Sequence, residues 1–396
     1  MKVKATPADF VVEEEAGGTV SDRRGEYAVF RLSKTSWDTF DLVDLLARIW
    51  GVPRSAISLG GFKDRHGSTA QRISVRGLKG KPAGLEEKNF TAAFLGWSEN
   101  PLSARDIRGN RFTITLRDLS AHDAGLISSN APEVERDGIP DYYDTQRFGS
   151  ARHGAGFMGK EIFLGRREKA LRLYFTASKF DDQKTRALKR CVIESWGRWE
   201  KCAGMGFGEY GRVLAYLATH RSAFHQALEL IDRRFLVFVL NAYQSFLFNE
   251  LLARWLRELA AESSTPLSPL RYPFGVFRFY HSLPPDMAGK VRGAILPVPG
   301  HDTVCGDPRV ARILSGVLEE EGIGLADLRV RQMHRINVGG VDRPAVVMPE
   351  DFSQSPPEPD DLYPGKQKTT LKFFLPRGAY ATLVIKRLSL ARPAAQ

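Results

Sequence analysis

The pattern of hydrophobic residues changes near residue 150, and this change constrains the fold of the 396-residue chain more than any other feature. Before it, the chain carries short strand patterns, at residues 9–14, 27–32, 73–76 and 111–117. After it, longer helical patterns dominate, at 187–202, 212–221 and 222–261, the last with a break near Asp232. Two apolar runs near the C-terminus, 371–375 and 380–385, again predict strands. A chain of this length exceeds one ordinary core, so we expect two or three domains.

The segment 111–117 predicts a strand because apolar and polar side chains alternate strictly along it. Its apolar face would carry Phe112, Ile114 and Leu116. Its polar face would carry cations and hydroxyls, on Arg111, Thr113, Thr115 and Arg117. Such a face suits a sugar-phosphate backbone. The alternative is a solvated sheet face with no ligand.

The segment 37–50 predicts a helix. Its apolar side chains recur at helical spacing, at Phe40, Val43, Leu46 and Trp50. Either Ser36 or Asp38 would cap its first turn. This helix leads towards a glycine-bracketed loop at 60–71, and the strand at 73–76 leaves that loop, so the loop is expected to be held between packed elements.

The composition indicates a soluble globular protein with a polyanionic partner. Lysine and arginine number 57 against 46 acids, which leaves a net charge of +11. Such an excess favours RNA or DNA first and an anionic membrane second. The N-terminus lacks the apolar core of a signal peptide, and we expect no membrane-spanning segment.

The three cysteines, Cys191, Cys202 and Cys305, are far apart and odd in number. They form no C-x-x-C pair, so we expect neither a disulfide framework nor a cysteine-type zinc site. The eight histidines also lack metal-binding spacing, and no metal site is predicted. A reducing, cytoplasmic location fits this cysteine content.

The loop GGFKDRHGSTAQ at 60–71 contains a single carboxylate, Asp64, between the cations Lys63 and Arg65. Opposite charges nearby favour the ionised form of an acid. Asp64 would therefore be a poor proton donor at neutral pH and a plausible nucleophile or base. The alternative is a solvated turn with local ion pairs.

The segment IPDYYDTQRFG at 139–149 places aromatic side chains among polar and cationic groups. Tyrosine and phenylalanine can stack an extruded base, and Arg147 could hold its phosphate. An ordinary aromatic turn is the alternative. The long helical region beyond it, with NAYQSFLFN at 241–249, is expected to be a core helix whose polar members could still reach a binding cleft.

Residues 61–71 resemble the signature Gly-Phe-Lys-Asp-Arg-x-x-x-Thr-x-Gln of the TruD family of tRNA pseudouridine synthases. Residues 141–149 resemble the family's second motif, Asn-Tyr-Phe-Gly-x-Gln-Arg-Phe-Gly, but Asp141 replaces the asparagine, Tyr143 a phenylalanine and Asp144 a glycine. The segments 4–14, 241–249, 296–303 and 374–382 are similar to further elements of the family, in the family's order.

The resemblance implies roles for individual residues. Asp64 would be the catalytic aspartate, and Lys4 could pair with it. The substrate-binding set implied by the motifs and their neighbours is Lys4, Phe10, Lys63, Arg65, Asp141, Tyr143, Arg147 and Tyr380. Phe10, Tyr143 and Tyr380 would line the base pocket, and arginines that include Arg65, Arg72, Arg111 and Arg147 would grip phosphates. Asp141 would bring an acid where the family presents a neutral amide.

The resemblance also implies an α+β fold with a pseudouridine synthase-like catalytic domain on a mixed, mainly antiparallel sheet. Residues 1–156 and 346–396 would form this domain, and 157–345 would be an inserted second α+β domain of the TRUD type. The implied activity is isomerisation of a uridine in tRNA, at position 13, by a cytoplasmic enzyme without cofactor or metal. The expected oligomeric state is a monomer.

Two alternatives from other classes stay open on the residues alone. A non-catalytic RNA-binding or chaperone protein would need the basic surface and the stacking aromatics but no particular carboxylate. A nuclease would need clustered acids for metal ions, and none is evident beside Asp64.

Overall fold

The computed structural model describes residues 1–18, 20–61, 63–65, 67–78, 82–330, 333 and 336–393. They form two compact units, a first unit of Met1–Ile139 with Val347–Arg392 and a second of Pro140–Val346 with the residues from Pro393. The short strands β9 (Ile139–Pro140) and β14 (Val346–Val347) lie where the chain passes from one unit to the other. The limits of the inserted domain, expected at 157 and 345, stay a prediction.

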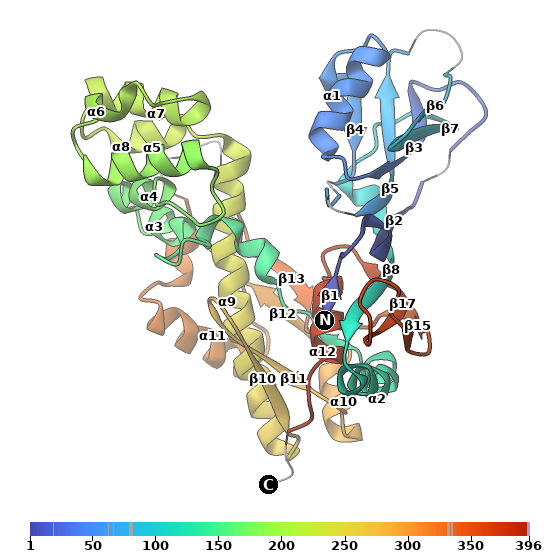
Figure 1. Cartoon of the computed structure of the whole chain (residues 1–396). Helices are drawn as coiled ribbons and strands as arrows, with labels where there is room; N and C mark the ends of the chain where they lie inside the picture. The colour runs from blue at the N-terminus through green and yellow to red at the C-terminus, as the bar shows by residue number, and fades with distance from the viewer. Residues whose placement is uncertain are drawn as a thin grey trace. The chain divides into compact units, whose positions relative to one another are not determined.

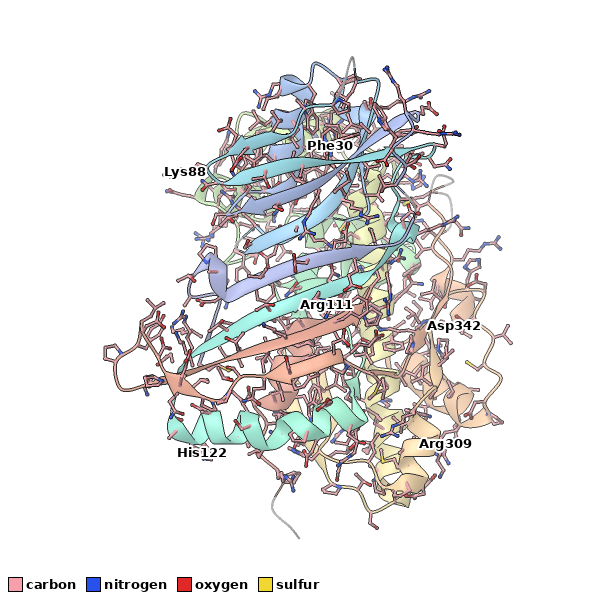
Figure 2. All side chains as sticks on the ribbon, turned by 90° about the vertical axis from the view of Figure 1, so that its right-hand side faces the viewer. Phe30, Lys88, Arg111, His122, Arg309 and Asp342 are labelled. Atoms are coloured by element: carbon pink, nitrogen blue, oxygen red, sulfur yellow. A yellow bond between two sulfur atoms is a disulfide. The ribbon has the colours of Figure 1, made fainter. Side chains whose placement is uncertain are left out.

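An eleven-stranded sheet forms the first unit, in the order β15-β17-β8-β2-β5-β3-β7-β6, with β1 beside β8, β16 beside β17 and β4 beside β5. Its strands are β1 Lys2–Val3, β2 Phe10–Ala16, β3 Tyr27–Thr35, β4 Ile57–Leu59, β5 Ser68–Arg76, β6 Leu85–Glu87, β7 Phe90–Ser98, β8 Ile107–Leu119, β15 Glu350–Gln354, β16 Glu358–Pro359 and β17 Gln367–Pro376. All these pairs are antiparallel except β2 with β5. The mixed, mainly antiparallel sheet is therefore confirmed, and Figure 2 shows it with Phe30 on β3 and Arg111 on β8.

Helix α1 (Thr39–Ile49) packs on the part of this sheet that contains β3, β5 and β7. Leu42, Val43 and Leu46 of α1 join Phe30 of β3 in one fully buried core. The side chain of Asp38 caps the helix by accepting a hydrogen bond from the backbone N–H of Phe40 at 2.8 Å. The helix predicted at 37–50 is thus confirmed, with the second of its two candidate caps in use.

The C-terminal segment returns to the sheet, because β17 pairs with β8 along most of its length. The strand predicted at 380–385 is wrong, since these residues begin helix α12 (Ala381–Leu388). Leu383, Val384 and Leu388 of α12 are fully buried, and the helix contacts α2 (Ala121–Asp137) in the same unit (Figure 1). A six-residue apolar run fits either period, so its burial in three dimensions decides the outcome.

The polar face predicted for 111–117 is occupied by acids of the same unit. Arg117 is buried, and it donates hydrogen bonds to Asp9 at 2.7 Å and to Asp360 at 2.9 Å. Arg111 donates to Glu15 at 3.0 Å and to Asp351 at 2.9 Å. The alternation itself is confirmed, but the face carries internal ion pairs rather than unpartnered cations.

The second unit is organised around the long helix α9 (Arg233–Glu262), drawn in yellow in Figure 1. Its other helices are α3 Met158–Phe163, α4 Arg167–Tyr174, α5 Gln183–Glu194, α6 Glu200–Ala203, α7 Gly208–Thr219, α8 Phe224–Glu229, α10 Pro285–Val291 and α11 Pro308–Glu320. Two antiparallel strand pairs accompany them, the hairpin of β10 (Leu267–Tyr272) with β11 (Gly275–Tyr280), and β12 (Ile295–Val298) with β13 (Val341–Pro344), which are separated in the chain by α11. Helices α8 and α9 are separated at Asp232, which caps α9, so the predicted break is confirmed.

By length and composition α9 could cross a membrane, so the expectation that no segment approaches such a span needs correction. However, 72% of its most apolar window is buried inside the fold, as in the core helix of a globular unit. Its buried side chains include Leu240, Leu247 and Leu251. The lack of membrane association stays a prediction.

The segment predicted as one helix at 187–202 is interrupted. Helix α5 ends at Glu194 and α6 begins at Glu200, and Gly197 between them has a φ of +85°. This turn returns the chain on itself, so that the Cα atoms of Cys191 and Cys202 lie 6.0 Å apart and their sulfurs form a disulfide. The expectation that the cysteines form no disulfide framework is therefore wrong for this pair, because spacing along the sequence could not show the turn that brings the two residues together.

Candidate functional site

The loop that carries Asp64 joins β4 to β5, and its backbone is held by a buried amine. Lys34 of β3 is only 2% exposed. Its Nζ donates hydrogen bonds to the backbone oxygens of Asp64 at 2.9 Å and of Trp37 at 2.8 Å. Burial lowers the pKa of Lys34 from its ordinary value, while the charges of Asp38 and Asp64 act in the opposite direction. The amine thus fixes the chain at Asp64 from below.

Two further side chains hold the same loop. The hydroxyl of Thr39, at the first position of α1, donates to the backbone oxygen of Lys63 at 3.2 Å. The amide of Gln71, on β5, donates to the backbone oxygen of Gly61 at 3.0 Å. The helix before the loop and the strand after it therefore both position it. Phe62 and His66 of this loop lie outside the described residues.

The carboxylate of Asp64 lies beside the amine of Lys4, and Asp64 Oδ2 accepts a hydrogen bond from Lys4 Nζ. The side chain of Asp64 is 31% exposed, so the carboxylate is partnered but open to solvent. Lys4 Nζ also lies 4.1 Å from the centre of the Phe10 ring, which is a cation–π contact. Three residues expected at one site, Lys4, Phe10 and Asp64, are thus brought together.

Gly67 permits this close arrangement. A Cβ added there would lie 2.6 Å from the backbone oxygen of Phe10. No side chain fits such an approach, so glycine is the residue that lets the loop reach β2. The sequence signal for this contact was the glycine three residues after Asp64.

The other expected residues of the first unit lie in different settings. Lys63 forms an ion pair with Glu14 at 2.8 Å and donates to Asn110 at 2.6 Å, so its amine is engaged inside the unit. Arg65 lies exposed in the turn after Asp64. Tyr380 is half-buried at the first turn of α12. Their contacts with substrate stay predictions.

In the second unit, Tyr143 is held on both its backbone and its ring. Asn249 of α9 accepts a hydrogen bond from the Tyr143 backbone N–H at 2.8 Å and donates to its backbone oxygen at 2.9 Å. The Arg343 guanidinium carbon lies 4.1 Å from the ring centre, and that of Arg147 lies 5.4 Å away. Phe248 contacts the same ring edge-to-face, with centres 5.6 Å apart. The ring is therefore pre-positioned.

Asp141 is buried rather than presented to a ligand. Arg343 of β13 donates from Nη2 to its Oδ1 at 2.8 Å, and from Nε to its backbone oxygen at 2.8 Å. Burial raises the pKa of the Asp141 carboxyl to about 7, and the Arg343 charge acts against this rise. The acid that replaces the family's asparagine thus meets an arginine of the same unit, and its role as a substrate contact stays a prediction.

Helix α9 was predicted mainly as a core helix, but it also supplies polar side chains that hold other segments of the second unit. Arg147 Nε donates to the hydroxyl of Ser245 at 3.0 Å, and Gln244 donates to the backbone oxygen of Pro299 at 2.7 Å. Asn249, Ser245 and Gln244 are all buried. The signal was present, because polar residues interrupt the apolar face of 241–249. No comparable signal marked Lys34 or Arg343.

Within the described ranges, no group of three or more histidine, cysteine, aspartate or glutamate side chains is arranged to hold a metal ion.

Comparison with known proteins places these features in a family. The family model described as tRNA pseudouridine synthase D (TruD) matches residues 1–265 and 286–388. A probable tRNA pseudouridine synthase D 1 of Methanococcus maripaludis is 30% identical, over 98% of this chain and 99% of that protein. The tRNA pseudouridine synthase D of Leptospira interrogans is 28% identical, over 98% and 96%. The crystal structure of the putative tRNA pseudouridine synthase D of Methanosarcina mazei shares the fold, with a TM-score of 0.71 at 24% identity, over 99% of this chain and 94% of that one.

Proposed function

Because this chain belongs to the TruD family of tRNA pseudouridine synthases and is thus an isomerase, we propose that it converts one uridine of tRNA to pseudouridine with Asp64 as the catalytic carboxylate. Family membership favours this activity over the binding-only protein and the nuclease. The position of the uridine, expected at 13, and a cytoplasmic, monomeric state belong to the same proposal.

The observation that carries the proposal is the setting of Asp64. Its backbone is fixed by Lys34, a buried side chain, while its carboxylate remains partly exposed beside Lys4. A fixed, accessible carboxylate with an adjacent cation can remain an anion and meet a substrate in a defined orientation. The arrangement differs from a solvated turn, whose backbone would be exposed to water.

The chemistry asks for one such group. The bond between N1 of the base and C1′ of the ribose breaks, the base turns, and a bond between C5 and C1′ forms. The hydrogen on C5 leaves as a proton and N1 takes one up, so no electrons are exchanged. Asp64 would either attack C1′ as a nucleophile or remove a proton from the ribose. In both routes the target uridine must leave its stack to reach the carboxylate.

The remaining expected residues take supporting parts in this proposal. Lys4 would maintain the anion of Asp64, and Phe10 with Tyr380 would present ring faces to the base. Tyr143 and Arg147 of the second unit would contact the same RNA, by stacking and by a phosphate interaction. Lys63 would act by orienting the loop, because its amine is already tied to Glu14.

The test is tritium release from tRNA labelled with [5-³H]uridine, which follows loss of the C5 hydrogen. Asp64→Asn should lower release about 1,000-fold or more, as loss of a group in the reacting centre does, with tRNA affinity little changed. Asp44→Asn is the matched control, because Asp44 is an exposed acid of the same unit that pairs with Arg54 at 3.1 Å. Near-normal release by Asp64→Asn would remove Asp64 from the catalytic role.

A further inference from the structure

A cavity of about 480 Å³ lies in the second unit, away in sequence from Asp64 and Lys4, and Thr145 of the segment 141–149 is part of its lining. Its walls include Arg152, Lys179, Phe180 and Phe274. The volume lies in the range of about 300 to 1,000 Å³ that small-molecule sites occupy. The cavity is therefore large enough to hold one nucleotide.

Phe180 gives this cavity an exposed aromatic wall. The residue lies between α4 and α5 and is 61% exposed, although aromatic side chains are usually buried. The guanidinium carbon of Arg152 is 5.1 Å from its ring centre, and Lys179 Nζ is 5.2 Å away. An open ring beside two cations is the composition of sites that stack a base and bind its phosphate.

The two cations are available for a ligand. Neither Arg152 nor Lys179 makes an ion pair with any described acid. The nearest acids in the sequence have other partners, because Asp181 pairs with Lys189 at 3.1 Å and Asp182 accepts from the Thr185 N–H at 2.9 Å in the first turn of α5. The local positive charge is therefore not neutralised from within the unit.

A second aromatic residue of the lining, Phe274, is anchored. The Phe274 ring lies 5.0 Å from the rings of both Phe148 and Phe157, so neighbouring aromatics hold it in place. Phe148 belongs to the segment 141–149 and is fully buried. A preformed wall lowers the ordering cost of binding a planar ligand.

We propose that this cavity binds one unstacked nucleotide of the RNA substrate, other than the uridine that is isomerised. The base would stack on Phe180, and Arg152 with Lys179 would contact the adjacent phosphates. None of the described side chains that line it is a carboxylate, so this lining can hold a nucleotide but offers no acid to react with it. The inference rests on the proposed function, because that function supplies RNA as the ligand.

The charges and the ring also predict how selective the pocket is. Its side chains offer cations and apolar surface, and stacking accepts any base. We therefore expect it to hold an unpaired nucleotide with little preference for the base, and to add to affinity rather than to the chemical step.

Fluorescence anisotropy with the full chain and a labelled tRNA tests the ring. Phe180→Ala should weaken binding about 5- to 100-fold, the range expected for loss of one base–aromatic stack. Phe180→Trp should restore affinity, and its added indole should be quenched when tRNA binds. Ile193→Ala is the matched control, because Ile193 is also an exposed apolar residue of this unit, 38% exposed. Unchanged affinity of Phe180→Ala would overturn the pocket.

The cations have a test of their own. The double change Arg152→Gln and Lys179→Gln should reduce the slope of log affinity against log salt by about one to two, as loss of two phosphate contacts does. Arg221→Gln is the control, because Arg221 already pairs with Glu200 at 2.6 Å and should change the slope less. If the double variant and Arg221→Gln gave equal slopes, the salt dependence would reflect the overall charge of the protein, and the proposed pocket would be wrong.

Kinetics separate this inference from the assignment of Asp64. At saturating tRNA, Phe180→Ala should keep kcat while KM rises, whereas Asp64→Asn should lose kcat while affinity stays. A fall in kcat with unchanged KM for Phe180→Ala would contradict the binding role but leave Asp64 untouched. Circular dichroism and the thermal midpoint of each variant establish that it is folded.

Discussion

The two units each contain an aspartate beside a cation, and the two pairs are built in opposite ways. Asp64 in the first unit has a side chain that is 31% exposed and a backbone held by buried groups. Asp141 in the second unit has a side chain that is 7% exposed, and its carboxylate is itself the buried group that Arg343 holds. In one pair the protein fixes the chain and leaves the acid open. In the other pair the carboxylate itself forms a buried structural contact.

The difference follows from the energetics of desolvation. An exposed pair gains little net stability, because water screens both charges. For a buried pair, the free energy lost on desolvating both charges can exceed the free energy gained from their attraction. Removing one partner is still costly, because the other charge is then buried and unpaired. Replacing a catalytic acid at a partly exposed position should therefore change the free energy of unfolding little. On this comparison we expect Asp141 to position Arg343, which also contacts the ring of Tyr143.

The largest expected effect comes from removing the partner of the buried acid. At pH 8, above the pKa of about 7 that burial gives Asp141, Arg343→Met should lower the free energy of unfolding by about 3 to 5 kcal/mol, since the Asp141 carboxylate is left unpaired. Urea unfolding measures this change. The double variant Arg343→Met with Asp141→Leu should recover much of the loss, because no charge then remains. A loss below about 1 kcal/mol for the single variant would place this pair with exposed ones.

The second prediction concerns pH, and it applies to the buried acid alone. The raised pKa of Asp141, about 7 against an ordinary 3.8, means that the folded chain keeps a proton which the unfolded chain has released. This group therefore makes stability fall as pH rises from about 4 to 7, by at most about 1.4 kcal/mol per pH unit. Asp141→Asn removes this contribution.

Unfolding curves at several pH values compare the wild type with that variant. The wild type should lose more stability than Asp141→Asn between pH 5 and pH 7. Parallel pH dependence in the two proteins would show that Asp141 is ionised throughout this range, held so by Arg343.

Much of the fold was predictable where a pattern is local. The helix at 37–50 and the strand at 111–117 repeat their period over several residues, and both are confirmed. The segment 380–385 is too short to distinguish a strand from a helix, and contacts with α2 decide it. The pairing of Cys191 with Cys202 depends on a turn at Gly197 that spacing does not reveal.

The site was predictable only in its motif residues. Asp64, Lys4 and Phe10 were named from the sequence, and the structure brings them together. Lys34 and Arg343 were missed because each acts through a partner distant in the chain, such as the 202 positions between Arg343 and Asp141. Their identity as lysine and arginine says nothing of burial, which only the folded chain decides.

The third prediction tests how the second unit holds Tyr143. Asn249→Ala removes both hydrogen bonds to the Tyr143 backbone, leaving an N–H and a carbonyl without that partner. The free energy of unfolding should fall by about 1 to 3 kcal/mol. Asn249→Asp should lose at least as much, because it places an unpaired carboxylate at a buried position beside the Tyr143 carbonyl oxygen. A loss below about 0.5 kcal/mol for Asn249→Ala would mean that these two hydrogen bonds do not hold Tyr143.

The smallest expected effect on stability is at the exposed pair, where the comparison is sharpest. Lys4→Met should change the free energy of unfolding by no more than about 1 kcal/mol, because both side chains of the pair, 22% and 31% exposed, are still partly screened by water. It should still lower the rate of tritium release about 10-fold or more, since a preorganised charge beside the reacting group is lost. Arg31→Met is the matched control, because Arg31 pairs with Glu13 on the same sheet and both side chains are exposed. Arg31→Met should change the free energy of unfolding by no more than about 1 kcal/mol and leave the rate of tritium release unchanged. If Lys4→Met lowered the free energy of unfolding as much as Arg343→Met and left activity unchanged, the Lys4–Asp64 pair would be structural, like the Arg343–Asp141 pair.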